Sequence, residues 1–507
     1  MSHAGPISYV SLTTKRGRPE VAADPAREAD RAILDALREG RARRDGRDRG
    51  AEALAAPPPS LMTEVDVHDA EAAETRAGPP RQRILRLRHA SPRAMAEFHA
   101  ALAPLLDDPA SPVDGVGADA PIGLADYAQP GGPGHALFGD ADDAMALINA
   151  AALARHGLDG AGVNVVVVDM GFDVRQVPGI RFGGGWQKLA GLPEDPYDDV
   201  WVPRGPRLPD LPEAERARLR HPGVADPRLC VHGAMMAQNI ARIAPRATLH
   251  DAPLVPLPEG AGITPLMASG RAFLSDAEAL FWAIDARIRA VPPWERGSWV
   301  IANPWAVFDR RRWPGTEAYT EGPVTAHALN RRIRAMTRRG IDFVFCAGNC
   351  GQFCPDGRCG PDDIGPGESL VGANAHPDVL SVGAVRTDGM WLGYSSQGPG
   401  TLYAEKPDLC APSHFAEAGD DYARHVGTSA ASAVATGVVA ALRSGWPAAE
   451  VPTPLLWQAL RESARGAYGG PRRTHDPQSG YGVIDAEAAV ARLSALHGPP
   501  RRQRASG

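Results

Sequence analysis

Three polar residues with the side chains needed for acyl transfer stand at the edges of predicted strands and helices. Asp169 follows the apolar run 163–168, and His232 precedes Gly233 at the start of a helical stretch. Ser429 follows a Gly-Thr pair at the head of an alanine-rich segment, where the N–H groups of a helix start favour developing negative charge. A serine hydroxyl becomes a nucleophile when a histidine takes its proton and a carboxylate holds that histidine in place.

Each of these residues also has an ordinary structural interpretation. An aspartate after a strand can cap a turn, and a serine at a helix start can be an N-cap. A histidine at a helix start is commonly only a polar end residue, although Gly233 beside His232 indicates a close approach of the backbone. The elements around the three residues must decide between chemistry and structure.

Strands and helices are predicted to alternate from residue 144 to residue 445. Buried strands are expected at 163–168, 298–303, 341–346 and 379–385. This alternation predicts an α/β fold with a doubly wound, mostly parallel sheet and helices on both faces. Because catalytic groups collect at the carboxyl ends of such strands, Asp169 lies where a site is expected.

The chain order Asp169, His232, Ser429 is the order of the subtilisin arrangement. The neighbouring residues agree, since Asp169-Met170-Gly171 is similar to Asp-(Ser/Thr)-Gly, 232–234 to His-Gly-Thr and 427–431 to Gly-Thr-Ser-Met-Ala. The stretch 146–490 therefore resembles the subtilisin-like serine proteases (subtilases, peptidase family S8). The resemblance also includes three stretches without catalytic residues, at 376–384, 394–399 and 406–408.

The resemblance implies a serine endopeptidase that acts on protein or peptide substrates through an acyl-enzyme on Ser429. His232 would be the general base and then the acid, and Asp169 the carboxylate that orients it. Asn349, in an Ala-Gly-Asn sequence after a strand, would stabilise the oxyanion together with the Ser429 backbone N–H. No cofactor is required. Structural calcium is frequent among subtilases, but no Asp-rich loop here has a spacing that assigns a metal site.

Several residues depart from the family pattern. Met170 replaces a small hydroxyl residue, Ala234 a threonine and Ala433 a proline. Pro304 and Trp305 fall in a segment that aligns with a substrate-binding strand of the relatives, and Pro304 has no N–H to donate. Two alternatives therefore stay open beside a general endopeptidase. One is a dedicated processing or maturation protease with narrow specificity, and the other is a pseudoprotease that binds peptides without cutting them.

Four of the six cysteines fall close together beside Asn349, at 346, 350, 354 and 359. Their spacing is not the Cys-x2-Cys pair of structural zinc sites. Cys346 is expected to point into the sheet. The other three are expected to be reduced or to form one local disulfide between two of Cys350, Cys354 and Cys359, and a metal-bound loop or redox control of the oxyanion site are the alternatives. Cys230 is expected to be a buried core thiol.

Composition and patterning bound the rest of the chain. It has 507 residues, 44% of them hydrophobic, and a net charge of −6, which is globular and gives no argument for nucleic acid. Neither a signal peptide nor a membrane span is predicted, so the cytoplasm is the expected compartment, with export by another route left open. The oligomeric state is not predicted.

Four regions are expected along the chain. Residues 1–80 are rich in charge, Ala and Pro and are predicted to be a largely disordered extension. A strand and a helix in 81–145 suggest a small prodomain or an N-terminal decoration, followed by a linker. Residues 146–490 form the predicted catalytic domain, and 491–507 a basic tail.

Overall fold

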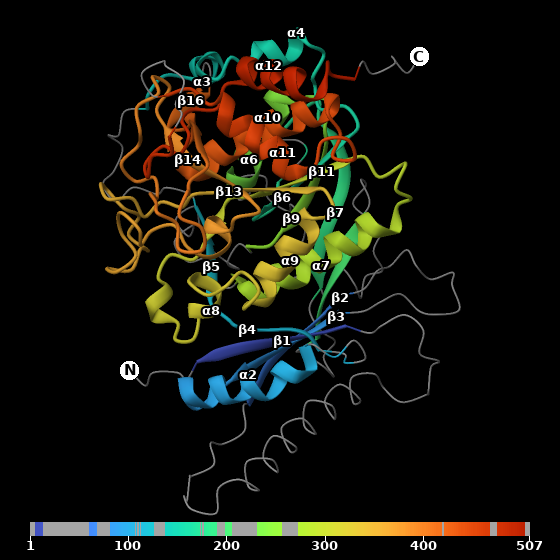
Figure 1. Ribbon diagram of the computed structural model, residues 1–507, viewed down its shortest axis with the longest axis vertical. Helices are drawn as coiled ribbons and strands as arrows, with labels where there is room; N and C mark the ends of the chain where they lie inside the picture. The colour runs from blue at the N-terminus through green and yellow to red at the C-terminus, as the bar shows by residue number, and fades with distance from the viewer. Residues whose placement is uncertain are drawn as a thin grey trace, which may run out of the picture.

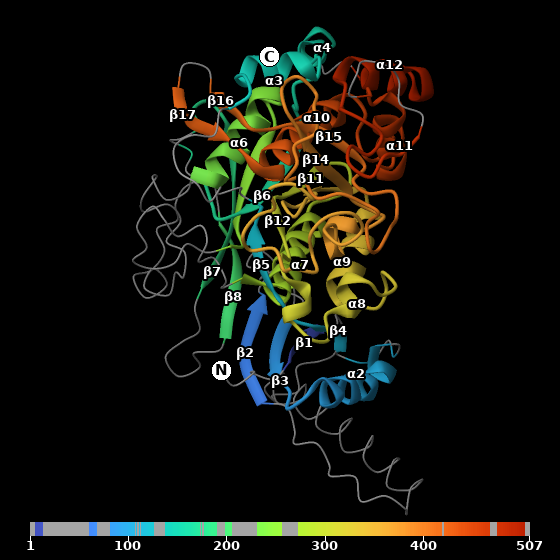
Figure 2. The same cartoon turned by 90° about the vertical axis from the view of Figure 1, so that its left-hand side faces the viewer.

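A twelve-stranded sheet runs through the protein in the computed structural model, as Figures 1 and 2 show. The structure describes residues 6–13, 60–67, 82–106, 108, 111, 113–125, 137–172, 174, 177–189, 198–204, 231–255, 272–417, 420–466 and 474–501. Seven adjacent strands of this sheet are parallel: β15 (Leu409–Pro412), β14 (Leu380–Val385), β13 (Ile341–Cys346), β11 (Ser298–Asn303), β6 (Val163–Asp169), β9 (Thr248–Pro253) and β7 (Arg181–Leu189).

Helices cover both faces of the parallel strands. In Figure 1, α6 (Val231–Ile243) and α10 (Gly427–Gly445) lie above the strands, and α7 (Leu274–Ala290) and α9 (Ala328–Thr337) lie below them. The central strand β6 supplies both cores, because its side chains alternate between the faces. Val165 and Val167 join the core that contains α6 and α10, whereas Val166 and Val168 join the core that contains α7 and α9. The predicted doubly wound α/β fold is confirmed.

Shorter elements surround this framework. They are α3 (Ala141–Leu147), α4 (Ala151–Arg155), the 3-10 helix η4 (Arg310–Arg312), α8 (Glu317–Thr320), the 3-10 helix η5 (Gly372–Ala375), the hairpin β16 (Phe415–Glu417) with β17 (Asp420–His425), α11 (Thr453–Ser463) and α12 (Ala486–His497). None of the helices in the described ranges has the length and apolar character that crossing a bilayer requires.

The N-terminal residues form a unit that extends the same sheet. We call β1 (Ile7–Thr13), β2 (Ser60–Val67), β3 (Gln82–Arg88), α2 (Pro92–Leu106) and β4 (Val113–Ala118) the N-terminal unit. Its strands pair antiparallel in the order β2-β3-β1-β4, and β2 pairs with β8 (Asp198–Arg204) of the main sheet. The strand and helix predicted near 81–106 are confirmed as β3 and α2. Strands β1 and β2 lie in the stretch 1–80, so the prediction of a largely disordered extension misses them.

The N-terminal unit is joined to α7 and α9 by buried polar contacts. Asp119, just after β4, accepts hydrogen bonds from Arg86 at 2.7 Å and from the Ser275 backbone N–H and hydroxyl at 3.0 and 2.7 Å. His327, at the start of α9, donates through Nε2 to the Ala118 carbonyl at 2.9 Å. These contacts fix where the chain leaves β4 and enters the next strand, β5 (Pro121–Leu124).

Candidate active site

Asp169 and His232 meet at the carboxyl end of the central strand β6. Asp169 is the last residue of β6 and His232 the second residue of α6, and both are buried. Nδ1 of His232 lies 2.8 Å from one Asp169 carboxylate oxygen and 2.9 Å from the other. Because a carboxylate only accepts, Nδ1 carries the proton, and this leaves Nε2 of the neutral ring able to act as a base. The Met170 backbone N–H also donates to the carboxylate, at 2.6 Å.

Gly233 makes this meeting possible by bringing α6 against the loop after β6. A Cβ atom added at Gly233 would lie 2.0 Å from the backbone oxygen of Gly171, a distance that no side chain tolerates. The close backbone approach predicted at this position is therefore confirmed. It sets the separation between the first turn of α6 and the end of β6.

Ser429 lies in the first turn of α10, a helix buried along its whole length. Its residues are mostly small, which lets α10 pack closely on the sheet. The N-cap position is Val426, with no side-chain cap bond, so the N-cap interpretation of Ser429 is wrong. The Ser429 hydroxyl donates to the Pro304 carbonyl at 3.2 Å.

Asn349 follows β13 and is tied to the residue before Ser429. Its Oδ1 accepts hydrogen bonds from the Thr428 backbone N–H at 3.0 Å and from the Thr428 hydroxyl at 2.8 Å. These two donors fix the orientation of the amide, so that Nδ2 must face the other way. There Nδ2 donates to the carbonyl of Ala125 at 2.7 Å.

The partner of Asn349 comes from a strand of the chain that lies across the site. β5 pairs antiparallel on one edge with β10 (Ala272–Phe273) and on the other with β12 (Trp305–Ala306), as the middle strand of a three-stranded sheet. Just beyond β5, the Ala125 N–H donates to the Pro304 carbonyl at 2.6 Å. The Ala125 amide and the Ser429 hydroxyl thus meet at the same oxygen, while Asn349 holds the Ala125 carbonyl. Figure 2 shows β5 running from the N-terminal unit toward β12 and β6.

Pro304 and Trp305, the unusual residues in the segment that aligns with a substrate-binding strand, do not obstruct this arrangement. Pro304 takes part through its carbonyl, so its missing N–H is not needed. The Trp305 ring is fully buried and packs against Phe345 and Phe281, with ring centroids 5.2 and 6.3 Å apart. Trp305 therefore belongs to the core that contains α7 and α9.

The cysteine cluster contains one disulfide, between Cys350 and Cys359. Of the two expected states of this loop, reduced thiols or one local disulfide, the structure shows the disulfide. Cys346 is buried in β13 as predicted, and burial raises the pKa of its thiol to about 12, which keeps it protonated and unreactive. Among the described residues, no group of three or more His, Cys, Asp or Glu side chains could hold a metal ion. No calcium site is assigned, and Cys230 lies outside the described residues.

The structure thus places an Asp–His pair at the end of a central strand and a serine in the first turn of a buried helix of a doubly wound α/β fold. The sequence model of Peptidase_S8, the subtilase family, matches residues 226–482, just over half of the chain. The chain therefore belongs to the subtilase family of serine proteases, whose substrates are proteins or peptides.

Two solved structures illustrate the wider likeness. The MycP3 protease from the type VII (ESX-3) secretion system is 20% identical, with a TM-score of 0.41, and the match covers 73% of this chain and 94% of that one. MycP1 from the ESX-1 type VII secretion system is 19% identical, with a TM-score of 0.41 and coverage of 76% and 94%. No curated protein matches this chain in sequence.

Proposed function

We propose that the protein is a serine endopeptidase that cleaves peptide bonds through an acyl-enzyme on Ser429. His232 Nε2 takes the hydroxyl proton as Oγ attacks the carbonyl carbon, and Asp169 stabilises the imidazolium that forms. The Asn349 amide and the Ser429 backbone N–H stabilise the oxyanion. His232 then gives its proton to the leaving amine. In the second half of the reaction water attacks the acyl carbon while His232 takes its proton, and the bond to Ser429 Oγ breaks as His232 returns the proton to that oxygen, which releases the acid.

The observation that carries this proposal is the set of hydrogen bonds that Ala125 makes beside Ser429 and Asn349. Its carbonyl belongs to the peptide bond between Ala125 and Asp126, and Asn349 Nδ2 donates to that carbonyl at 2.7 Å. Its amide shares the Pro304 carbonyl with the Ser429 hydroxyl. The carbonyl of Ala125 thus accepts from the proposed oxyanion donor, and the amide of the same residue donates to the acceptor that the nucleophile uses, as expected of a bound substrate.

The same contacts support a prodomain role for the N-terminal unit. The residue that follows β5 is bonded at the site while β5 stays joined to that unit, so the uncut chain would block its own site. Cleavage after Ala125 would separate the unit from the catalytic domain. The prodomain boundary that we propose is therefore 125/126, inside the region 81–145 to which the sequence assigned a possible prodomain.

Intact-mass analysis of wild type and Ser429→Ala, with and without a fluorophosphonate probe, tests these proposals. The wild-type chain is expected to yield a fragment beginning at Asp126 and to take up one probe molecule. Ser429→Ala is expected to remain full length and unlabelled. Folded wild type that is neither cut nor labelled, even after limited proteolysis of the N-terminal unit, would favour the pseudoprotease alternative.

A further inference from the structure

The methyl group of Ala125 is buried in a small hydrophobic cluster, and its amide donates to the same carbonyl as the Ser429 hydroxyl. We call this cluster the primary pocket. Its members are all apolar or sulfur-containing, and those other than Ala125 itself are Ala306, Phe308, Cys346, Cys350 and Cys359. Ala125 is fully buried there, and only Cys359 is more than slightly exposed. A substrate residue on the acyl side of the cleaved bond would occupy the same place.

One wall of the primary pocket is built by the segment between the two disulfide cysteines. Within that segment, Arg358 is paired with the buried Asp356 through two hydrogen bonds of 2.9 and 2.8 Å. The Arg358 guanidinium lies 4.0 Å from the centroid of the Phe308 ring. The Cys350–Cys359 disulfide closes this segment, so that Arg358 is held over Phe308, which belongs to the same cluster as Ala125.

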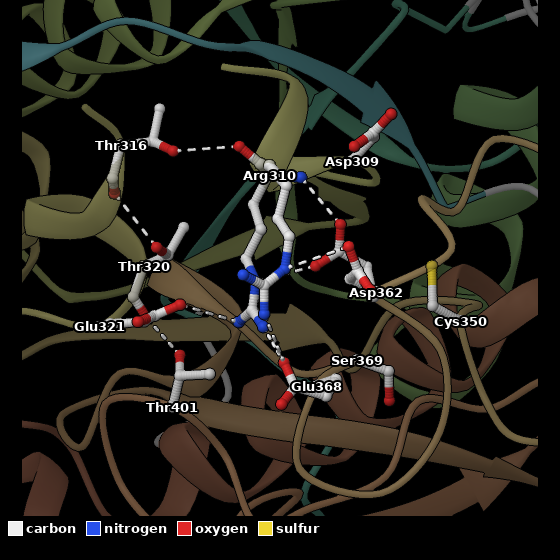
Figure 3. A network of polar contacts seen from close by, with 12 residues as sticks. Asp309, Arg310, Thr316, Thr320, Glu321, Cys350, Asp362, Glu368, Ser369 and Thr401 are labelled. Atoms are coloured by element: carbon white, nitrogen blue, oxygen red, sulfur yellow. Dashed lines mark hydrogen bonds and ion pairs between the residues drawn. The ribbon is translucent and has the colours of Figure 1, made fainter. Parts of the chain in front are cut away.

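A buried arginine fixes the chain that follows Phe308, the residue beneath Arg358. Arg310, two residues after Phe308, pairs through Nε with Asp363 at 2.8 Å and contacts Glu368 and Glu321, as Figure 3 shows for the two glutamates. The Asp363 carboxylate also accepts the Arg310 backbone N–H at 3.0 Å. The chain after Phe308 is therefore fixed, and the pocket cannot widen through a simple shift of this wall.

The wall faces a second residue of the bound strand. Side chains alternate along β5, so Ile122 and Leu124 point into the core under the sheet while Gly123 lies on the side of Ala125. A Cβ atom added at Gly123 would lie 3.3 Å from both the Arg358 guanidinium and the Phe308 ring. The two positions that face the wall thus carry the two smallest residues.

We propose that Phe308 and the Cys350–Cys359 disulfide determine specificity by closing the primary pocket to side chains larger than those of Ala, Gly or Ser. Counted back from the cleaved bond, the first and third residues of preferred substrates are then small, and the second and fourth are aliphatic. This inference rests on the proposed proteolytic function. It favours the narrow-specificity alternative over a general endopeptidase, because one extra methylene in a fitted pocket already changes selectivity by about 10- to 200-fold.

Self-cleavage of full-length variants tests this inference. Ala125→Ser is expected to be cut, whereas Ala125→Leu is expected to be cut at least about tenfold more slowly because its side chain overfills the pocket. The time course of the Asp126 fragment is followed by intact mass, with fluorophosphonate labelling of Ser429 as a separate readout. Cleavage of Ala125→Leu at the wild-type rate would overturn the inference and leave the proposed function standing.

Wall variants separate pocket closure from misfolding of Ala125→Leu. Adding Phe308→Ala to that variant is expected to restore cleavage after position 125 by opening room for the larger side chain. Cys350→Ser with Cys359→Ser is expected to reduce the discrimination between Ala and Leu, while Cys354→Ser, in the same loop but exposed, serves as the matched control.

The outcomes of these variants point to different parts of the reasoning. Unchanged discrimination in both wall variants would overturn the role of the wall. A folded wild-type protein that neither cuts itself nor takes up the probe, even after limited proteolysis of the N-terminal unit, would refute the proposed function, and this inference with it.

Discussion

Replacing Asn349 with alanine should separate catalysis from stability. The change removes the Nδ2 donor that lies 2.7 Å from the Ala125 carbonyl. We expect self-cleavage to slow by about 10²- to 10³-fold, a magnitude taken from subtilisin itself. The change also leaves the buried Thr428 N–H and hydroxyl without their shared acceptor, which should lower the free energy of unfolding by about 1–3 kcal/mol.

Thr428→Val is the matched control for this prediction. It removes the hydroxyl that donates to Asn349 and accepts from the Gly348 N–H, but it leaves the Nδ2 donor in place. We expect a comparable loss of stability in urea unfolding with a much smaller loss of rate. The assay is the fraction of chain that remains full length over time after refolding. Equal rates for Asn349→Ala and Thr428→Val would refute the reasoning, because stability alone would then explain both.

Two further substitutions test the framework around the site. Gly233→Ala should reduce fluorophosphonate labelling by about 10²-fold, because its Cβ would collide with the Gly171 oxygen and displace His232 from Asp169; labelling within a few-fold of wild type would show that α6 can yield without harm. His327→Gln should make the free energy of unfolding depend less on pH. Burial lowers the pKa of His327 from 6.5 to about 3 in the folded state, so as pH falls between these values the unfolded chain takes up a proton that the folded chain does not, and the folded state loses stability. The measurement is urea unfolding of Ser429→Ala protein, which is expected not to cut itself. Between about pH 7 and pH 4.5 this protein should lose about 2 kcal/mol more of its free energy of unfolding than the same protein with His327→Gln added. Equal losses would contradict the assignment.

The parallel sheet could be predicted because its strands are apolar on both faces. The valines of β6 serve two cores at once, so the sequence shows them as one uninterrupted run. Strands with other compositions were missed. β7 and β8 lie in 172–229, a stretch with many Pro, Gly and charged residues, and the three glycines of β7 weaken any strand signal. β1 is strongly strand-like, but a long stretch rich in charged residues follows it.

The polar residues of the site could be named from the sequence, and the strand that occupies it could not. Asp169 and His232 stand beside recognisable elements, and their short sequence contexts resemble those of a known family. β5 has four residues in a stretch rich in Gly, Pro and Asp, and its partners β10 and β12 are more than a hundred residues away. No local pattern indicates such a pairing. The Cys350–Cys359 link was one of several pairings that the spacing allowed.

The strand that carries Ala125 selects the bond to be cut together with the pocket. Asp119 anchors the start of the segment through Arg86 and Ser275, and six residues later both polar backbone groups of Ala125 are bonded. β5 is paired on both edges between these two points, so a slip of one residue would turn every side chain to the opposite face. Such a slip would also bring Leu124 to a pocket that now holds a methyl group. A larger residue at position 125 should therefore slow cleavage there and not move it to a neighbouring bond.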